Sequence, residues 1–166
     1  MICAMARAKG ITTIVDGAHA YSHFPFKLTD FDCDFYGTSL HKWLLAPIGA
    51  GFLYVRKDRI EKHWALQPAG VGQAKDIRKF EEIGTHPQAN FNAVSAALAF
   101  SQGMGLDRKI ARLRYLRDRW ANRLLAASDR VKVLTPLGPD KSGAICMFNV
   151  DGLDPVKLGG WLMANH

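Results

Sequence analysis

The chain of 166 residues lacks a long hydrophobic run. Its most apolar stretch, from Trp43 to Val55, is interrupted by Pro47, Gly49 and Gly51, whereas a membrane span needs about 20 consecutive apolar residues. The first residues contain no basic segment followed by a continuous apolar stretch, so we expect no secretory signal peptide. The first absence argues against a membrane-spanning chain, and we expect a cytoplasmic location.

Cysteine is scarce, and the few cysteines are far apart in the sequence. Cys3, Cys33 and Cys146 match neither a disulfide framework nor the closely spaced cysteines of a zinc site, so we expect a reducing compartment. Residue types that can bind zinc do gather in one segment: His19, His23, Cys33 and His41. They lack the two matching short-spaced pairs that zinc sites show, and we predict no metal site.

Acidic residues are outnumbered by basic ones, 15 to 22, which gives a net charge of +7. Most of the excess lies between Asp107 and Arg130, where eight residues are basic and three are acidic. These basic residues flank the apolar stripe of one predicted helix, and no motif of a nucleic-acid-binding domain accompanies them. We therefore interpret them as a solvated helix face and expect no nucleic-acid partner.

The composition itself is that of an ordinary globular protein, with 48% hydrophobic and 22% charged residues. Apolar patterns predict a helix over residues 1–10 and short strands over 11–15, 33–38 and 51–56. The first of these strands is rich in β-branched residues, so we expect it to be buried. A helix that leads into a buried strand is half of a parallel α/β unit.

A second group of elements follows a predicted loop over residues 60–79. The patterns predict helices over 85–103 and 107–128, strands over 131–134 and 144–150, and a helix from 154 onward. The final strand, strand and helix form a separate α+β unit. We place a domain boundary near residues 105–107, which gives domains of 1–105 and 106–166.

Polar side chains follow two of the predicted strands. Asp16 ends the first strand and His19 comes three residues later, while Ser39, His41 and Lys42 follow the second strand. Ligands of open α/β sheets bind outside the carboxyl ends of the strands. If the two strands are neighbours, a carboxylate, an imidazole, a hydroxyl and an amine converge on one crevice.

Each of these two segments also has a purely structural interpretation. Asp16-Gly17 alone is typical of a plain turn, and His41-Lys42 of a solvated helix start. The second interpretation is weakened by the apolar residues 43–45 (Trp-Leu-Leu), which we expect to bury the segment. A lysine in apolar surroundings is more readily a neutral, nucleophilic amine.

Three motifs together are more specific than any one of them: Val15-Asp-Gly-Ala-His-Ala20, Thr38-Ser-Leu-His-Lys-Trp43 and Pro47-Ile-Gly-Ala-Gly-Phe-Leu-Tyr54. The combination resembles the class V aminotransferase family, which comprises pyridoxal-phosphate (PLP) enzymes of fold type I. The segments from Gly37 to Trp43 and from Phe80 to Thr85 look most similar to its isopenicillin N epimerase branch. The resemblance covers nearly the whole chain, and its motifs are strongest in the first 87 residues.

The resemblance implies an α/β fold in two parts. Residues 1–105 would be the later part of a large PLP-binding domain with a mostly parallel sheet, and residues 106–166 the beginning of an α+β small C-terminal domain. In the family, Met1 corresponds to the interior of a helix, and the small domain continues beyond the position of His166. We therefore expect an internal piece of a longer protein, without the residue that stacks on PLP or the arginine that binds the substrate carboxylate, and inactive alone.

Family roles then follow position by position. Lys42 matches the catalytic lysine that forms the Schiff base with PLP and afterwards acts as a base at the substrate Cα. Asp16 matches the aspartate that pairs with the pyridine nitrogen, and His19 the position that contacts the phenolic oxygen. Ser39 and His41 match ligands of the phosphate group. A protonated ring nitrogen strengthens electron withdrawal by PLP, which explains the need for a carboxylate.

The resemblance also implies a partner and leaves the reaction open. Thr85 matches a residue that reaches the phosphate of the partner subunit's cofactor, so we expect a homodimer that acts on an amino acid. Transamination, epimerisation and lyase chemistry remain open. A cysteine desulfurase needs a mobile catalytic cysteine, whereas we interpret Cys146, in a predicted strand, and Cys3 as core residues. A non-catalytic remnant of such an enzyme is the other alternative.

Overall fold

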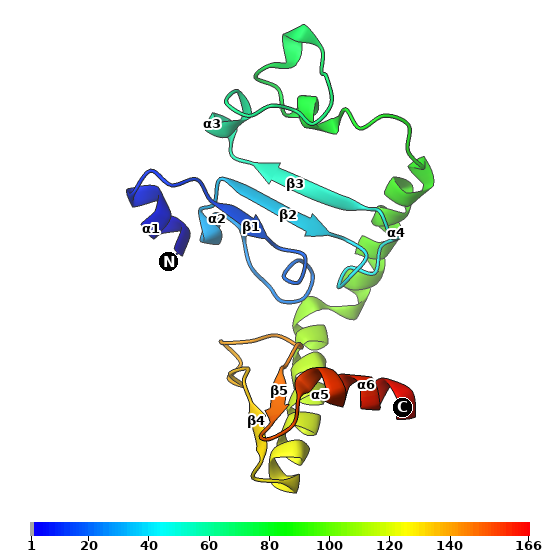
Figure 1. Cartoon of the computed structure of the whole chain (residues 1–166). Coiled ribbons are helices and arrows are strands. Elements are labelled where there is room, and N and C mark those ends of the chain that lie inside the picture. The colour runs from blue at the N-terminus through cyan, green and yellow to red at the C-terminus, as the bar shows by residue number, and fades with distance from the viewer. Residues whose placement is uncertain (1) are drawn as a thin grey trace. The chain divides into compact units, whose positions relative to one another are not determined.

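The computed structural model describes residues 2–166, which divide into two compact units, one that ends at Leu106 and one that spans Asp107–His166 (Figure 1). Met1, with which the predicted first helix begins, lies outside the described residues. The elements of the first unit follow in chain order: α1 (Ile2–Ala8), β1 (Ile14–Asp16), α2 (Leu28–Phe31), β2 (Phe35–Ser39), β3 (Gly51–Val55), α3 (Lys57–Ile60), the 3-10 helices η1 (Val71–Gln73) and η2 (Ile77–Glu81), and α4 (Gln88–Met104). Within residues 2–166, no helix combines the length and the apolar character needed to cross a bilayer.

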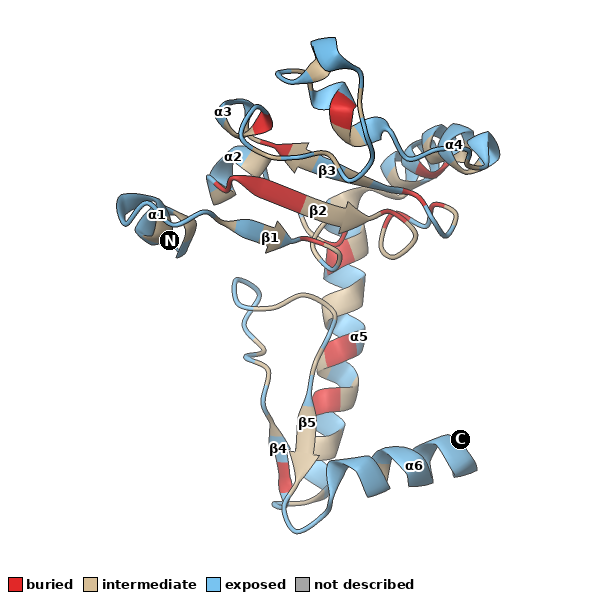
Figure 2. Cartoon of the chain, turned by 45° about the horizontal axis from the view of Figure 1, so that its top comes forward, coloured by how far each residue is buried: buried red, intermediate tan, exposed pale blue. Residues whose placement is uncertain are grey.

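The first unit is built on a three-stranded sheet in the order β1-β2-β3. β1 runs parallel to β2, with Asp16 opposite Gly37, and β3 runs antiparallel to β2. The central strand β2 is the most buried of the three at Phe35 and Tyr36, as Figure 2 shows. The expected burial of the first strand is wrong for the described residues: Ile14 is 78% exposed, and β1 is an edge strand of this three-stranded sheet.

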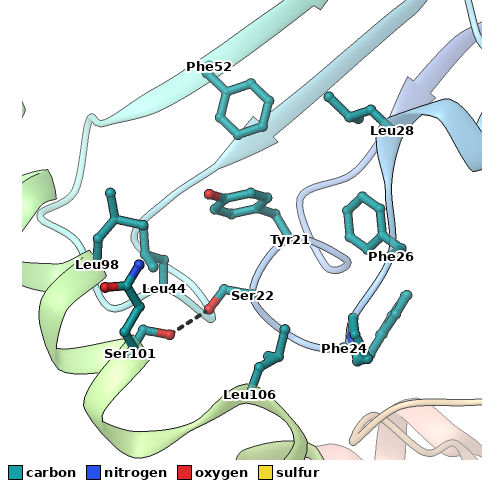
Figure 3. A pocket seen from close by; sticks show the side chains of 12 residues that line it. Tyr21, Ser22, Phe24, Phe26, Leu28, Leu44, Phe52, Leu98, Ser101 and Leu106 are labelled. Carbon is teal, nitrogen blue, oxygen red and sulfur yellow. Dashed lines mark hydrogen bonds between the residues drawn. The ribbon is translucent and has the colours of Figure 1, made fainter.

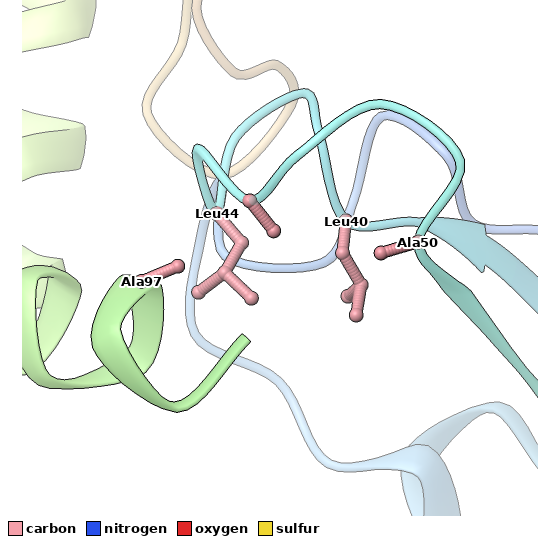
Figure 4. Close-up of a cluster of buried hydrophobic side chains, with 5 residues drawn as sticks. Leu40, Leu44, Ala50 and Ala97 are labelled. Carbon is pink, nitrogen blue, oxygen red and sulfur yellow. The ribbon is translucent and has the colours of Figure 1, made fainter. Parts of the chain in front are cut away.

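A small apolar core joins the loop after β2 to helix α4. Leu40 and Leu44 from the loop pack with Ala50 and with Ala97 of α4 (Figure 4). The amide Nδ2 of Asn90, in the first turn of α4, donates to the Ile48 carbonyl at 3.0 Å. These contacts fix the loop that follows β2 as it turns back into β3, and Leu40 N–H closes it with a 2.9 Å bond to the Ala50 carbonyl.

The second unit begins in a long helix. Its elements are α5 (Leu106–Ala127, whose first residue belongs to the first unit), the antiparallel strands β4 (Val131–Val133) and β5 (Phe148–Val150), and α6 (Pro155–Asn165). The side chain of Asp154 caps α6 by accepting hydrogen bonds from the Val156 and Lys157 amides, a standard way to satisfy the free N–H groups of a helix start.

One member of the basic face of α5 is not solvated, and that part of the sequence interpretation is wrong. Arg117 is only 2% exposed. Its guanidinium donates to the Leu137 carbonyl at 2.7 Å, to Ser142 Oγ at 2.7 Å and to the Gly143 carbonyl, and pairs with Asp118. A buried cation is tolerated when every donor finds an acceptor, so Arg117 holds the loop between β4 and β5 against α5.

A buried carboxylate ties the other end of the sheet together. Asp34, 3% exposed, accepts from the Thr13 amide at 2.8 Å and pairs with Arg59 at 2.8 Å and with Arg56 at 2.7 Å. Burial alone would raise the pKa of Asp34, but the hydrogen bonds from Thr13 and Arg59 and the charge of Arg56 outweigh it and lower the pKa to about 2. Asp34 therefore links the entry of β1 to the end of β3.

Replacing Asp34 by Asn tests this link. The folded pKa lies below the ordinary value of 3.8, so the ionised carboxylate stabilises the fold above about pH 4 and that stability is lost as the pH falls toward 2. We expect Asp34→Asn to lower the free energy of unfolding at pH 7 by about 2 kcal/mol, and to flatten its fall between pH 4 and 2. Urea unfolding followed by circular dichroism measures both effects. Asp58→Asn, at an exposed partner of Arg56, is the control and should change little.

Candidate functional site

Because β1 and β2 run parallel, their carboxyl ends, with the polar residues that follow them, lie at the same end of the sheet. Asp16, the last residue of β1, lies opposite Gly37, and Ser39 ends β2 two residues further on. The neighbouring arrangement of these strands, on which the sequence argument depended, is therefore present. His19 follows β1 in a turn and Lys42 follows β2 in the loop that leads to β3.

The turn after β1 is packed so closely that only glycine fits at position 17. The amide of Gly17 donates to the Gly37 carbonyl at 2.7 Å, and its own carbonyl accepts from the Tyr36 hydroxyl and from Thr38 Oγ1. A Cβ atom at this position would overlap the ring of Tyr36. The phenol of a buried β2 residue thus fixes the backbone between Asp16 and His19.

The carboxylate of Asp16 is exposed and only half used by the fold. Its Oδ1 atom accepts a 2.9 Å hydrogen bond from the Ala18 amide, which is the turn that a purely structural interpretation expects. Within residues 2–166 its second oxygen, Oδ2, accepts no hydrogen bond. The turn therefore orients the carboxylate and leaves one oxygen available to another donor.

The structure joins two of the predicted site residues directly. Lys42 Nζ lies 3.0 Å from Nε2 of His19, across 23 positions of sequence. An ammonium group has no acceptor, so a charged Lys42 donates to Nε2, and His19 is then neutral with its proton on Nδ1. The expected burial of the lysine segment is only partly correct: Leu44 is 2% exposed, but Leu45 is 57% exposed and Lys42 is half-buried.

Two residues beside this pair were not predicted as part of a site. His23 lies flat on the indole of Trp43, with ring centroids 3.8 Å apart and planes 8° apart, and His19 contacts the same indole edge-on at 6.2 Å. His23 entered the sequence argument only as a potential zinc ligand. Its spacing of four from His19 is the one signal that relates them, since residues four apart lie on one side of a helical turn.

The two predicted anion ligands have unused polar atoms. Nδ1 of His41 is buried and has no hydrogen-bond partner within residues 2–166. The hydroxyl of Ser39, at the end of β2, also makes no hydrogen bond within the described part of the chain. Since buried polar groups are almost always paired, an unpaired imidazole nitrogen and a free hydroxyl, two residues apart in the chain, suit a ligand that carries oxygen atoms.

Thr85 is not brought into this group. It is exposed, between η2 and α4, and across residues 2–166 it makes no hydrogen bond to any of the others. The cysteines also differ from expectation in part. Cys146 is half-buried and precedes β5 rather than lying in a strand, and Cys3 is half-buried in α1, so neither is a core residue. Cys33 is the buried cysteine, and burial raises the pKa of its thiol.

A pocket of about 460 Å³ is lined in part by Leu44, two residues after Lys42 in the chain (Figure 3). Its walls are mainly aromatic and aliphatic, from Tyr21, Phe24, Phe26, Phe52 and Leu98, among others. Ser22 and Ser101 also line it, and their Oγ atoms lie 3.2 Å apart. None of the six predicted site residues lines this pocket, so the polar group at the strand ends and the apolar pocket are separate features.

The fold and the sequence both match known proteins. The structure of a cysteine desulfurase from Thermococcus onnurineus superimposes with a TM-score of 0.74 at 22% identity, covering 98% of this chain and 42% of that one. Its fold, PLP-dependent transferase fold type I, is therefore the fold of this chain. The model of the family described as aminotransferase class-V matches residues 1–165, and the chain belongs to this family of PLP-dependent enzymes.

Curated relatives agree with the motif-based assignment. The isopenicillin N epimerase of Streptomyces clavuligerus is 37% identical over 95% of this chain and 44% of its own length. A cysteine desulfurase of Enterobacter is 32% identical over 97% of this chain and 41% of its own length. The chain thus spans less than half the length of the curated relatives it matches.

Gly17→Ala tests whether the turn beneath Tyr36 sets the strand ends. The added Cβ meets the Tyr36 ring, so we expect a loss of about 1–3 kcal/mol in the free energy of unfolding, as for other overpacked sites. Gly37→Ala is the matched control, since a Cβ there meets no atom within 4 Å. Thermal unfolding of both variants makes the comparison, and equal stabilities would contradict the close packing at Gly17.

Proposed function

We propose that this chain carries the lysine side of the active site of a PLP-dependent enzyme that acts on an amino acid. The observation that carries the proposal is the pairing of Lys42 Nζ with His19 Nε2 at 3.0 Å, at the sheet edge where Asp16 also lies. The unpaired Nδ1 of His41 supports the same cofactor, because a phosphate oxygen would satisfy it.

The residues present fit PLP in their chemistry. The free Oδ2 of Asp16 is an acceptor for a ring N–H, which a carboxylate stabilises in its protonated state. The Ser39 hydroxyl and the His41 imidazole can donate to phosphate oxygens. When bound, PLP withdraws electrons from the substrate Cα and so weakens its C–H bond.

Lys42 has two tasks in this proposal. Its amine would hold the cofactor at the aldehyde carbon, and Nζ would also serve as the base that takes the proton from the substrate Cα. When Lys42 is charged, its ammonium group donates a hydrogen bond to Nε2 of His19. The imidazole therefore holds Nζ in place and can accept its proton when the amine must be neutral.

For the reaction subtype we follow the isopenicillin N epimerase branch, which the motifs resemble. Transfer, epimerisation and elimination all begin with removal of the Cα proton, which Lys42 would perform. An epimerase also needs an acid on the opposite face of Cα. We propose an isopenicillin N epimerase-like member of the family on the 37% identity to that enzyme, with the whole protein, of which this chain matches less than half, supplying the substrate clamp.

Reductive trapping tests the cofactor role of Lys42. The 166-residue chain is incubated with PLP and cyanoborohydride, digested and mapped by mass spectrometry. We expect the pyridoxyl label to concentrate on Lys42, at least roughly tenfold above the mean of the other lysines, because His41 and Ser39 recruit the phosphate. Lys42→Ala should remove that peak, whereas Lys27→Ala, at an exposed lysine of the same unit, should leave it. A label spread evenly over exposed lysines would contradict the proposal.

We also propose that the whole protein forms a homodimer in which Thr85 reaches the partner's cofactor site. Support comes from the loop that precedes it. Trp64, Leu66 and Val71 are each at least 96% exposed, and a cluster of large exposed apolar side chains marks an interaction surface. Thr85 itself is exposed and free of hydrogen bonds within residues 2–166, as a residue used by a second subunit would be.

Sedimentation analysis tests the dimer. We expect the 18.4 kDa chain to sediment with about twice its mass, and Trp64→Asp with Leu66→Asp to sediment as a monomer, because buried unpaired carboxylates oppose association. Val156→Asp is the control, since Val156 is 83% exposed in the second unit. A single-chain mass for the unsubstituted protein at high concentration would contradict this loop as the interface.

A further inference from the structure

His23 is a buried histidine that contacts both segments of the candidate site. The residue is 2% exposed. Nδ1 lies 2.8 Å from the His19 carbonyl, and the ring covers the indole of Trp43 at 3.8 Å. The carbonyl can only accept, so Nδ1 of His23 carries a proton and donates it. His23 is therefore held in a defined orientation by contacts that include this hydrogen bond and this ring stack, and its ring also lies 5.5 Å from that of Phe24.

These contacts form a closed set that links the turn containing His19 to the loop containing Lys42. His23 binds the backbone of His19 and stacks on Trp43, which is covalently next to Lys42. Lys42 Nζ then returns to His19 Nε2 at 3.0 Å. The backbone before His23 supports this inward placement, because Ser22 adopts the left-handed region at φ 58°, a conformation that costs energy for any residue except glycine.

We infer that His23 is a positioning residue: by joining the His19 carbonyl to the Trp43 indole, it fixes the imidazole of His19 against the amine of Lys42. Only the effect of His23 on catalysis rests on the proposed function. The arrangement itself, with Nε2 of His19 as an acceptor for Lys42, is a property of the free chain. Two ring contacts on Trp43 leave the segment that carries Lys42 little freedom to turn away.

Two substitutions separate the contacts of His23. His23→Phe keeps a flat ring for the stack on Trp43 and removes the donor to His19. His23→Asn keeps a donor near the position of Nδ1 and removes most of the stack. His63→Phe is the matched control, because His63 Nδ1 makes the same 2.8 Å bond to the carbonyl four residues earlier, at Arg59, and packs on Phe35 at the opposite end of the sheet.

The first readout needs no cofactor. In ¹⁵N-histidine spectra of the unsubstituted chain, we expect His19 in the tautomer with the proton on Nδ1, as donation from Lys42 requires. His23→Phe should shift His19 toward a mixture of tautomers, and His63→Phe should not, even where both lower the melting temperature alike. If His23→Phe and His23→Asn both leave the His19 signals unchanged, His23 only packs and the inference is wrong.

The second readout measures whether the contacts of His23 affect the reactivity of Lys42. We expect His23→Phe to slow reductive trapping of PLP at Lys42 by roughly fivefold, the effect of one net hydrogen bond, with partial rescue in His23→Asn. If the unsubstituted chain shows no preference for Lys42, the proposed function fails, while the His19 tautomer still decides the role of His23. An altered tautomer in His63→Phe would instead attribute the effect to general loss of stability and overturn the inference.

Discussion

The parallel register of β1 against β2 is the constraint on which the candidate site depends. It places Asp16 opposite Gly37 and so brings the turn with His19 and the loop with Lys42 to one edge of the sheet. A slip of one residue would turn the Asp16 side chain to the other face. The register is held at both ends: Asp34 binds the Thr13 backbone where β1 begins, and Gly17 lies under Tyr36 where it ends.

The sequence could predict the local part of this arrangement and not its long-range contacts. Strand positions and the polar residues that follow them come from short patterns, which survive folding because each depends on a few adjacent residues. The contact between Lys42 and His19 spans 23 positions and the ion pair of Asp34 with Arg59 spans 25. A local sequence pattern cannot predict contacts between residues so far apart in the chain. The family motifs named the residues, but the hydrogen bond between them came from the structure.

Two errors have the same physical origin. A run of β-branched residues predicts a strand but not its neighbours, so the edge position of β1 and the exposure of Ile14 could not be read from it. Likewise, eight basic residues on and just after one helix look equivalent in sequence. Arg117 is the buried one because the carbonyls of Leu137 and Gly143 accept hydrogen bonds from its guanidinium. Whether a residue is buried depends on the segments that pack against it, and sequence periodicity does not reveal those segments.

The site divides into groups held by strands and a group held by side chains. Asp16 and Ser39 end strands, so the sheet fixes them. Lys42 lies in a loop, where His19, Trp43 and, through Trp43, His23 restrain it. In the proposed role, Lys42 would first bind a cofactor aldehyde and later reach the substrate Cα, so its amine would have to move without moving the groups proposed to anchor the cofactor. Restraint by a hydrogen bond and ring contacts, which can break and reform, meets that need; a place within the strand ladder would not.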